Sequence, residues 1–161
     1  MPVNLRMHNC HLAKKVLHGL LPALHCLQIL CLSYYNISDL PGSMGDLKHL
    51  CYLDLCDTQL RRLPQSISTR FNLQTLLLTG CRRLIELPTN MRKLINLRHL
   101  DIRYTSLNVM PEELNRLKNL WTSTTFVVGK HSGARIRELR DLSHIGGTLW
   151  IFKLQNVLLG G

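Results

Sequence analysis

The stretch LQTLLLTGCRRLIELPTNMRKLINLRHLDI, residues 73–102, contains one complete structural unit and the start of the next. It opens at Leu73 with the order Leu-x-x-Leu-x-Leu, and the order returns as Leu-x-x-Leu-x-Ile at Leu97. Between the two, around Pro88, apolar residues recur at every third or fourth position. Alternation at period two predicts a half-buried strand, whereas the wider spacing predicts a short helical or 3-10 return.

The same unit recurs over most of the chain with a period of 23 to 24 residues, which leucines mark at 27, 50, 73, 97 and 120 and prolines at 41, 64, 88 and 111. One unit cannot cover its own apolar face, so such units stack, their strands pair in parallel and their Leu side chains merge into one core. The composition agrees, with 35 Leu against 3 Phe, 4 Tyr and 2 Trp. We therefore predict an α/β fold, a right-handed horseshoe-shaped solenoid of about six or seven units with a parallel concave sheet.

The order matches the leucine-rich-repeat signature Leu-x-x-Leu-x-Leu-x-x-Asn/Cys-x-Leu four times between Leu24 and Leu120. Its Asn/Cys position holds Tyr35, Thr58, Cys81 and Thr105. The last three are small polar side chains, which we expect to hydrogen-bond backbone groups at the turn. Tyr35 does not fit this expectation.

Outside the regular repeats the period weakens. We expect residues 1–23 to form an irregular first repeat, 24–120 four regular repeats, and 121–161 irregular repeats with an inserted loop. Since neither end shows the polar cap that closes a solenoid, we interpret the chain as a segment of a longer protein, truncated at its C-terminus.

Three details mark the irregular places. Ser123 and Thr125 replace the expected core Leu pair, and the alternation through Ile151 and residues 154–157 predicts a final strand. Arg70 stands where the register calls for an apolar residue, so Arg70→Leu is expected to raise the melting temperature.

Several classes of protein are disfavoured. The richest apolar stretch, residues 16–32, is interrupted by His18, Pro22, His25 and Gln28 and is no membrane-spanning helix. The N-terminus lacks the pattern of a secretory signal, so we expect a soluble intracellular protein, most simply cytoplasmic, whose six cysteines are reduced.

Catalytic and metal sites have little support. Asp54 and Asp101 share a repeat position two units apart, on the order of 10 Å with parallel strands about 5 Å from one another. That is wide for a pair of catalytic carboxylates. The spacing of the N-terminal histidines and cysteines is incomplete as a zinc pattern, so we expect no enzyme, no metal and no cofactor. The residues in question are His8, Cys10, His11, His18, His25 and Cys26.

The formal net charge of +10 is compatible with binding to the phosphates of a nucleic acid. Arg61, Arg62, Arg82 and Arg83 recur at one repeat position, the turn after the strand. No aromatic residues that could stack on bases are interleaved with them, so solvated or partner-binding charge is the better interpretation and nucleic acid is disfavoured.

A partner surface is best placed on the concave sheet, where the variable residues between the core leucines all point one way. Four columns result, which start at Ile29, Cys31, Ser33 and Tyr34 and repeat with the period. Tyr and Arg are frequent interface anchors. The residues we expect to contact a protein partner are Tyr34, Tyr52, Asp54, His99, Asp101, Arg103 and Tyr104.

The chain resembles the repeats of plant intracellular disease-resistance proteins of the coiled-coil, nucleotide-binding, leucine-rich-repeat type. The resemblance rests on ISDLPGSMGDLKHLCYLDL (37–55), LRRLPQSIS (60–68), the stretch at 73–102 and, most specifically, FVVGKHSGARIRELRDLSHIGGTLWIFKLQNV (126–157). In that family the repeats sense pathogen effectors or guarded host proteins and hold the nucleotide-binding domain inactive. The resemblance implies the same partners here.

The chain departs from the family because it contains neither the coiled coil nor the nucleotide-binding domain. Its Gly129–Lys130 pair is followed by His131, so it carries no P-loop, and ATP or ADP would bind only to a missing upstream domain. Two alternatives remain open: a stand-alone intracellular leucine-rich-repeat scaffold for signalling proteins, and a basic nucleic-acid-associated module.

Overall fold

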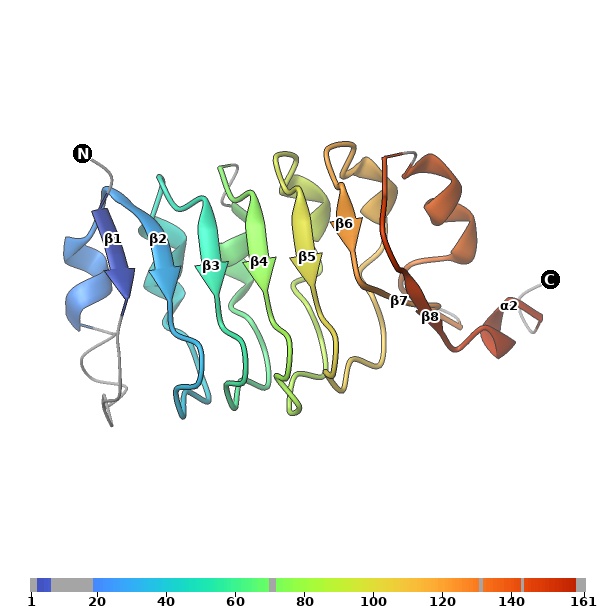
Figure 1. Cartoon of the computed structure of the whole chain (residues 1–161), viewed down its shortest axis with the longest axis horizontal. Coiled ribbons are helices and arrows are strands. Elements are labelled where there is room, and N and C mark those ends of the chain that lie inside the picture. The colour runs from blue at the N-terminus through green and yellow to red at the C-terminus, as the bar shows by residue number, and fades with distance from the viewer. Residues whose placement is uncertain (1–2, 7–18, 70–71, 131, 143, 159–161) are drawn as a thin grey trace.

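The computed structural model describes residues 3–6, 19–69, 72–130, 132–142 and 144–158. Six strands form one parallel sheet in chain order (Figure 1): β1 (Val3–Arg6), β2 (Leu27–Cys31), β3 (Tyr52–Asp54), β4 (Thr75–Leu77), β5 (His99–Asp101) and β6 (Thr122–Ser123). Two further strands, β7 (Thr125–Val127) and β8 (Trp150–Phe152), form a separate parallel pair. Parallel strands that follow one another in chain order, each joined to the next by a return, are what stacked repeats require.

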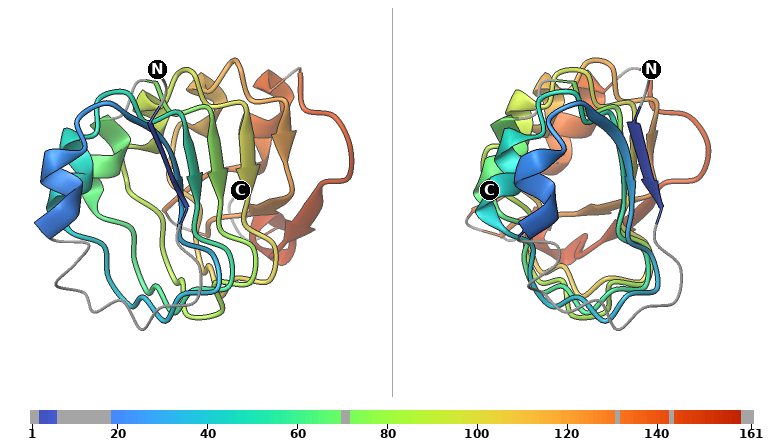
Figure 2. Two further views of the ribbon diagram at one scale, coloured as in Figure 1. Left: turned by 60° about the vertical axis from the view of Figure 1, so that its left-hand side comes forward. Right: turned by 90° about the vertical axis from the view of Figure 1, so that its left-hand side faces the viewer.

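Short helical returns bring the chain back from the end of one strand to the start of the next. Seen along the stack, the returns line one side of the molecule and the strands line the other (Figure 2). The returns are 3-10 helices, as the spacing predicts, and a four-residue α-helix follows the last strand. The 3-10 returns are η1 (Leu21–Ala23), η2 (Gly42–Asp46), η3 (Gln65–Thr69), η4 (Met91–Lys93), η5 (Leu114–Arg116) and η6 (Ile136–Asp141). The α-helix is α2 (Gln155–Leu158).

The repeated proline begins the return in three units. Its carbonyl oxygen accepts the N–H of the residue three positions on, at 3.0 Å for Pro41, 3.0 Å for Pro64 and 3.2 Å for Pro88. Proline suits this place because its missing N–H would have no partner in a first helical turn. The proline lattice in the sequence therefore marks where each return starts.

The core lies between the sheet and the returns and consists mostly of leucine. In β3 and its extension, Leu53 and Leu55 have no exposed surface, and the same holds for Leu76 and Leu78 in the next unit. The residues between them are half-buried on the other face of the sheet. The predicted solenoid and its period-two alternation are thus confirmed.

The small polar side chains of the repeat signature do bind the turn. Thr58 Oγ1 donates to the carbonyl oxygen of Leu55 at 2.9 Å, and Thr105 Oγ1 donates to that of Ile102 at 2.9 Å. Cys81 Sγ donates to Leu55 O at 3.0 Å. Tyr35 instead fills its place with a ring that is 7% exposed.

The structure corrects the end of the chain. Residues 155–158 form α2 rather than the continuation of a strand, because Lys153 adopts a positive φ of 60° and the following N–H groups turn back on residues 153 and 154. Ser123 and Thr125 do occupy core positions, with 4% and 7% of their surface exposed. Arg70 lies outside the described residues.

Candidate protein-interaction surface

The sheet aligns the predicted columns of variable residues. Strand pairing places Tyr52 beside Ile29 and Thr75, and Asp54 beside Cys31 and Leu77. The next pairing extends these rows to His99 and Asp101. All these side chains are half-buried, whereas the leucines between the two rows, Leu30, Leu53, Leu76 and Leu100, are buried. The two rows therefore form one continuous outward surface along β2 to β5, where several of the residues proposed from the sequence lie together.

Three of the proposed residues lie outside the strands, and two of them, Tyr34 and Tyr104, occupy equivalent places in the turns after β2 and β5. They share a left-handed backbone with the residues at the same repeat position in the two units between them. The φ values are 66° for Tyr34, 55° for Asp57, 74° for Gly80 and 57° for Tyr104. Most of their side-chain surface is in solvent, with Tyr34 80% and Tyr104 75% exposed. These rings stand at the rim of the sheet rather than within it.

Asp54 stabilises the turn after β3 as well as facing outward. Its Oδ1 accepts the N–H of Cys56 at 3.0 Å. Burial, together with the hydrogen bond and negative charge of Asp54, raises the pKa of the Cys56 thiol to about 12. A thiol with such a pKa stays protonated at neutral pH and is a poor nucleophile.

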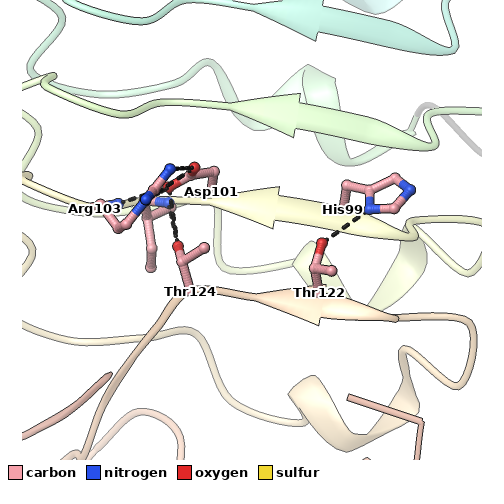
Figure 3. A network of polar contacts seen from close by, with 6 residues as sticks. His99, Asp101, Arg103, Thr122 and Thr124 are labelled. Carbon is pink, nitrogen blue, oxygen red and sulfur yellow. Dashed lines mark hydrogen bonds and ion pairs between the residues drawn. The ribbon is translucent and has the colours of Figure 1, made fainter. Parts of the chain in front are cut away.

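Asp101 makes the corresponding contact after β5 and adds an ion pair (Figure 3). Its carboxylate accepts the backbone N–H of Arg103 at 3.1 Å and the Arg103 Nη2 group at 2.6 Å, and Thr124 Oγ1 donates to it at 3.0 Å. Burial raises the pKa of Asp101, but the hydrogen bonds from Arg103, Thr79 and Thr124 outweigh burial and lower it. Asp101 and Arg103 therefore lie on the outward surface as a paired unit.

His99 begins an aromatic cluster that the sequence did not reveal. Its Nδ1 lies 2.9 Å from Thr122 Oγ1 (Figure 3). Its ring packs edge to face against that of Trp121, with 6.2 Å between the two ring centroids. The Arg98 guanidinium lies 5.0 Å from the Trp121 ring centroid. Trp121 is 49% exposed, and tryptophan and arginine are enriched at interface hot spots. The chain has only two tryptophans, and this scarcity was the one feature of the sequence that could have drawn attention to Trp121 as a candidate contact residue.

The basic residues after the strands lie on exposed turns, as predicted. Arg61, Arg82 and Arg83 are exposed, and Arg62 Nε lies 3.0 Å from Glu86 Oε1. A salt bridge between two exposed side chains adds little to stability. This edge is positive, and its electrostatic field can attract acidic partners.

The described residues offer no metal site and no disulfide. No three His, Cys, Asp or Glu side chains within them converge on a possible ion. The first four histidines and cysteines considered from the sequence, at positions 8–18, lie outside the described residues. None of the described cysteines, Cys26, Cys31, Cys51, Cys56 and Cys81, forms a disulfide. In the same part of the chain no helix has the length and apolar character needed to cross a membrane.

A parallel sheet backed by 3-10 returns, with a Leu core and outward columns, defines a leucine-rich-repeat protein. The profile of the family described as Leucine-rich repeat region matches residues 4–145, and the chain belongs to this family. Two solved structures share the fold. A leucine-rich-repeat protein of Leptospira interrogans, LIC12759, gives a TM-score of 0.69 at 24% identity and covers 86% of this chain and 36% of that one. The leucine-rich-repeat domain of the type III effector XopL gives 0.68 at 26% identity, with 82% and 45% covered.

The sequence relatives are more specific, since they are plant disease-resistance proteins. A protein of Arabidopsis thaliana named as a disease resistance protein, At3g14460, is 57% identical over 151 residues, which are 94% of this chain and 11% of the relative. The RPP13-like protein 1 of the same species, also named as a disease resistance protein, is 48% identical over 93% of this chain and 14% of its own length. The TMV resistance protein N of Nicotiana glutinosa is 43% identical over 39% of the chain. The chain thus spans about a seventh or less of the curated relatives it matches.

Proposed function

We propose that this chain is the protein-recognition segment of a plant immune receptor and that it senses a pathogen effector or a guarded host protein without catalysing a reaction. The observation that carries this proposal is the 57% identity to a plant disease-resistance protein over 94% of the chain. The continuous outward rows on β2 to β5 supply a surface of the right kind, because repeat solenoids bind partners on such extended faces.

In a full receptor the same segment would also contact the receptor's own nucleotide-binding domain, and any ATP or ADP would belong to that domain. We place the protein in the cytoplasm on the basis of the relatives' class. The alternatives of a stand-alone signalling scaffold and of a nucleic-acid module lead to different partners in the experiment below.

Affinity capture from extracts of infected and uninfected plants tests the proposal. The test variant combines Tyr34→Ala, Tyr52→Ala and Tyr104→Ala on the sheet side. The matched control combines Lys48→Ala, Lys93→Ala and Ile95→Ala, three exposed residues in or just after the returns η2 and η4. Asp54 and Asp101 are left intact because they also hold their turns together.

We expect a captured effector or host protein to be retained by the control and lost by the test variant. Capture that neither variant changes would contradict recognition by this face. Capture that nuclease treatment abolishes would favour the nucleic-acid module, and capture of signalling proteins alone, without effector or guarded protein, would favour the scaffold.

A further inference from the structure

The sheet splits at Thr124, and the cause is a change of hydrogen-bond partner. In each of the three preceding unit pairs the backbone ladder continues past the strands, as in Leu32 N to Asp54 O at 2.8 Å and Leu78 N to Asp101 O at 2.8 Å. The same register would join Ile102 N to Thr124 O. The N–H of Ile102 instead donates to the Thr124 hydroxyl at 3.2 Å, and the Thr124 carbonyl accepts the N–H of Trp150 at 3.0 Å.

The split opens a pocket of about 670 Å³ between the turn after β5 and the β7–β8 pair. Buried side chains of Ile102, Leu107 and Val127 line it, and their exposed fractions are 1%, 8% and 3%. Trp150 and Phe152, from one face of β8, also line it and are 58% and 53% exposed. An apolar pocket of a few hundred Å³ is the usual size for a binding site.

Two positively charged side chains, Arg103 and Lys153, also line this mainly apolar pocket. Arg103 uses Nε and Nη2 on Asp101, which leaves its Nη1 group available. Lys153 Nζ donates one of its three N–H groups to Asn108 O at 2.6 Å. Among the described residues no Asp or Glu lines the pocket itself; Asp101 pairs with Arg103 from beside it, so the preference for an anion rests mainly on Lys153.

We propose that this pocket receives an extended segment of a protein partner, with one large apolar side chain inserted and a carboxylate beside it paired with Arg103 or Lys153. A small ligand inside the pocket would leave the exposed rings of Tyr104, Trp150 and Phe152 in water. A polypeptide that inserts one side chain also covers these rings, and large exposed apolar clusters of this kind mark protein contacts. The inference rests on the proposed function, since it names the chemistry of a recognised partner.

The two tryptophans of the chain provide the measurement. Each gives one indole N–H signal in a nitrogen-15 correlation spectrum, which Trp121→Phe assigns. Trp150 lines the pocket and Trp121 does not, so Trp121 is an internal control. The probes are five peptides, acetyl-Gly-Asp-Z-Asp-Gly-amide, in which Z is Leu, Ile, Phe, Tyr or Trp.

We expect at least one of these peptides to shift the Trp150 signal saturably and to leave the Trp121 signal in place. Replacement of Z by Ala should weaken binding at least tenfold, and replacement of both Asp residues by Lys at least fivefold. Phe152→Ala and, independently, Tyr104→Ala should weaken it at least tenfold. Lys153→Met should weaken binding at least threefold, whereas the control Lys93→Met should not change it.

Each contrary result overturns the proposal. If all five peptides leave the Trp150 signal unmoved, the pocket receives no such segment. If N-acetyl-phenylalanine binds as tightly as the Phe peptide, the pocket is a small-molecule site. If the Trp150 signal depends on the concentration of the chain itself, a second copy is the occupant. Any of these results leaves the proposed function standing provided that the tyrosine variant still loses its captured partner.

Discussion

The thiol of Cys81 donates a hydrogen bond to the carbonyl oxygen of Leu55 in the preceding repeat, over 3.0 Å. The hydroxyl of Thr58 donates to the same oxygen at 2.9 Å and lies 3.3 Å from the Cys81 sulfur. One buried carbonyl thus joins two adjacent units through the signature position of both. This contact couples the stability of neighbouring repeats, which in a solenoid depends on the interfaces between units.

Thr58→Val and Cys81→Ala should therefore be non-additive. Each single change leaves one donor on Leu55 O and should lower the free energy of unfolding by about 1 kcal/mol, whereas the double variant leaves the buried carbonyl without either donor. Urea unfolding at pH 7 should show a double effect at least about 0.5 kcal/mol larger than the sum. Thr105→Val, whose hydroxyl bonds Ile102 O, should add simply to Cys81→Ala, and simple additivity in both pairs would refute the shared acceptor.

Tyr35→Phe should stabilise the protein. The Tyr35 hydroxyl is buried and has no hydrogen-bond partner among the described residues. An unsatisfied buried polar group costs about 1–3 kcal/mol, so its removal should raise the free energy of unfolding by on the order of 1 kcal/mol. Tyr34→Phe, at a residue that is 80% exposed, should leave unfolding unchanged. A lower midpoint for Tyr35→Phe in urea would show that the hydroxyl is satisfied.

Gly80→Ala should destabilise the turn after β4. Gly80 has a φ of 74°, and a methyl group there would lie 2.1 Å from Asp57 Oδ1. Asp57 is exposed and can move aside, so the left-handed backbone is the main cost, about 1–2 kcal/mol for an L-residue. Gly42→Ala is the control, because a methyl group there meets no atom within 4 Å. Equal melting temperatures for the two variants would contradict the prediction.

Asp101 should contribute stability that acid removes. Its pKa is lowered in the folded protein, so its charged form favours folding above the unfolded-state value of about 3.9, and this contribution is lost as pH falls through the folded value. Asp101→Asn should therefore lower the urea midpoint at pH 7 and have a progressively smaller effect below about pH 4. Asp46→Asn, at an exposed residue, is the reference. An effect of Asp101→Asn that is independent of pH would show that charge plays no part.

The repeats could be predicted in detail because the residues that form the strand and the return recur within each unit. The strand at Leu76 and Leu78, the return after Pro88 and the alignment of Asp54 with Leu77 and Asp101 all follow from one lattice. The regular repeat ends after Thr124, and beyond that point one prediction from the sequence was wrong. Alternation in residues 154–157 predicted a strand, but the left-handed Lys153 turns the chain into α2.

The sequence by itself determined the solenoid, its period and the identity of the outward columns, since period-two alternation is a local property that each unit repeats. Only the tertiary structure decided where the sheet divides and which residues meet across the division. The pocket joins residues 102–107, which belong to the regular repeats, to residues 148–153, which lie far along the chain and outside those repeats. Their meeting depends on whether the Thr124 carbonyl turns toward Ile102 or toward Trp150, and that competition between two donors is settled only when the whole chain packs.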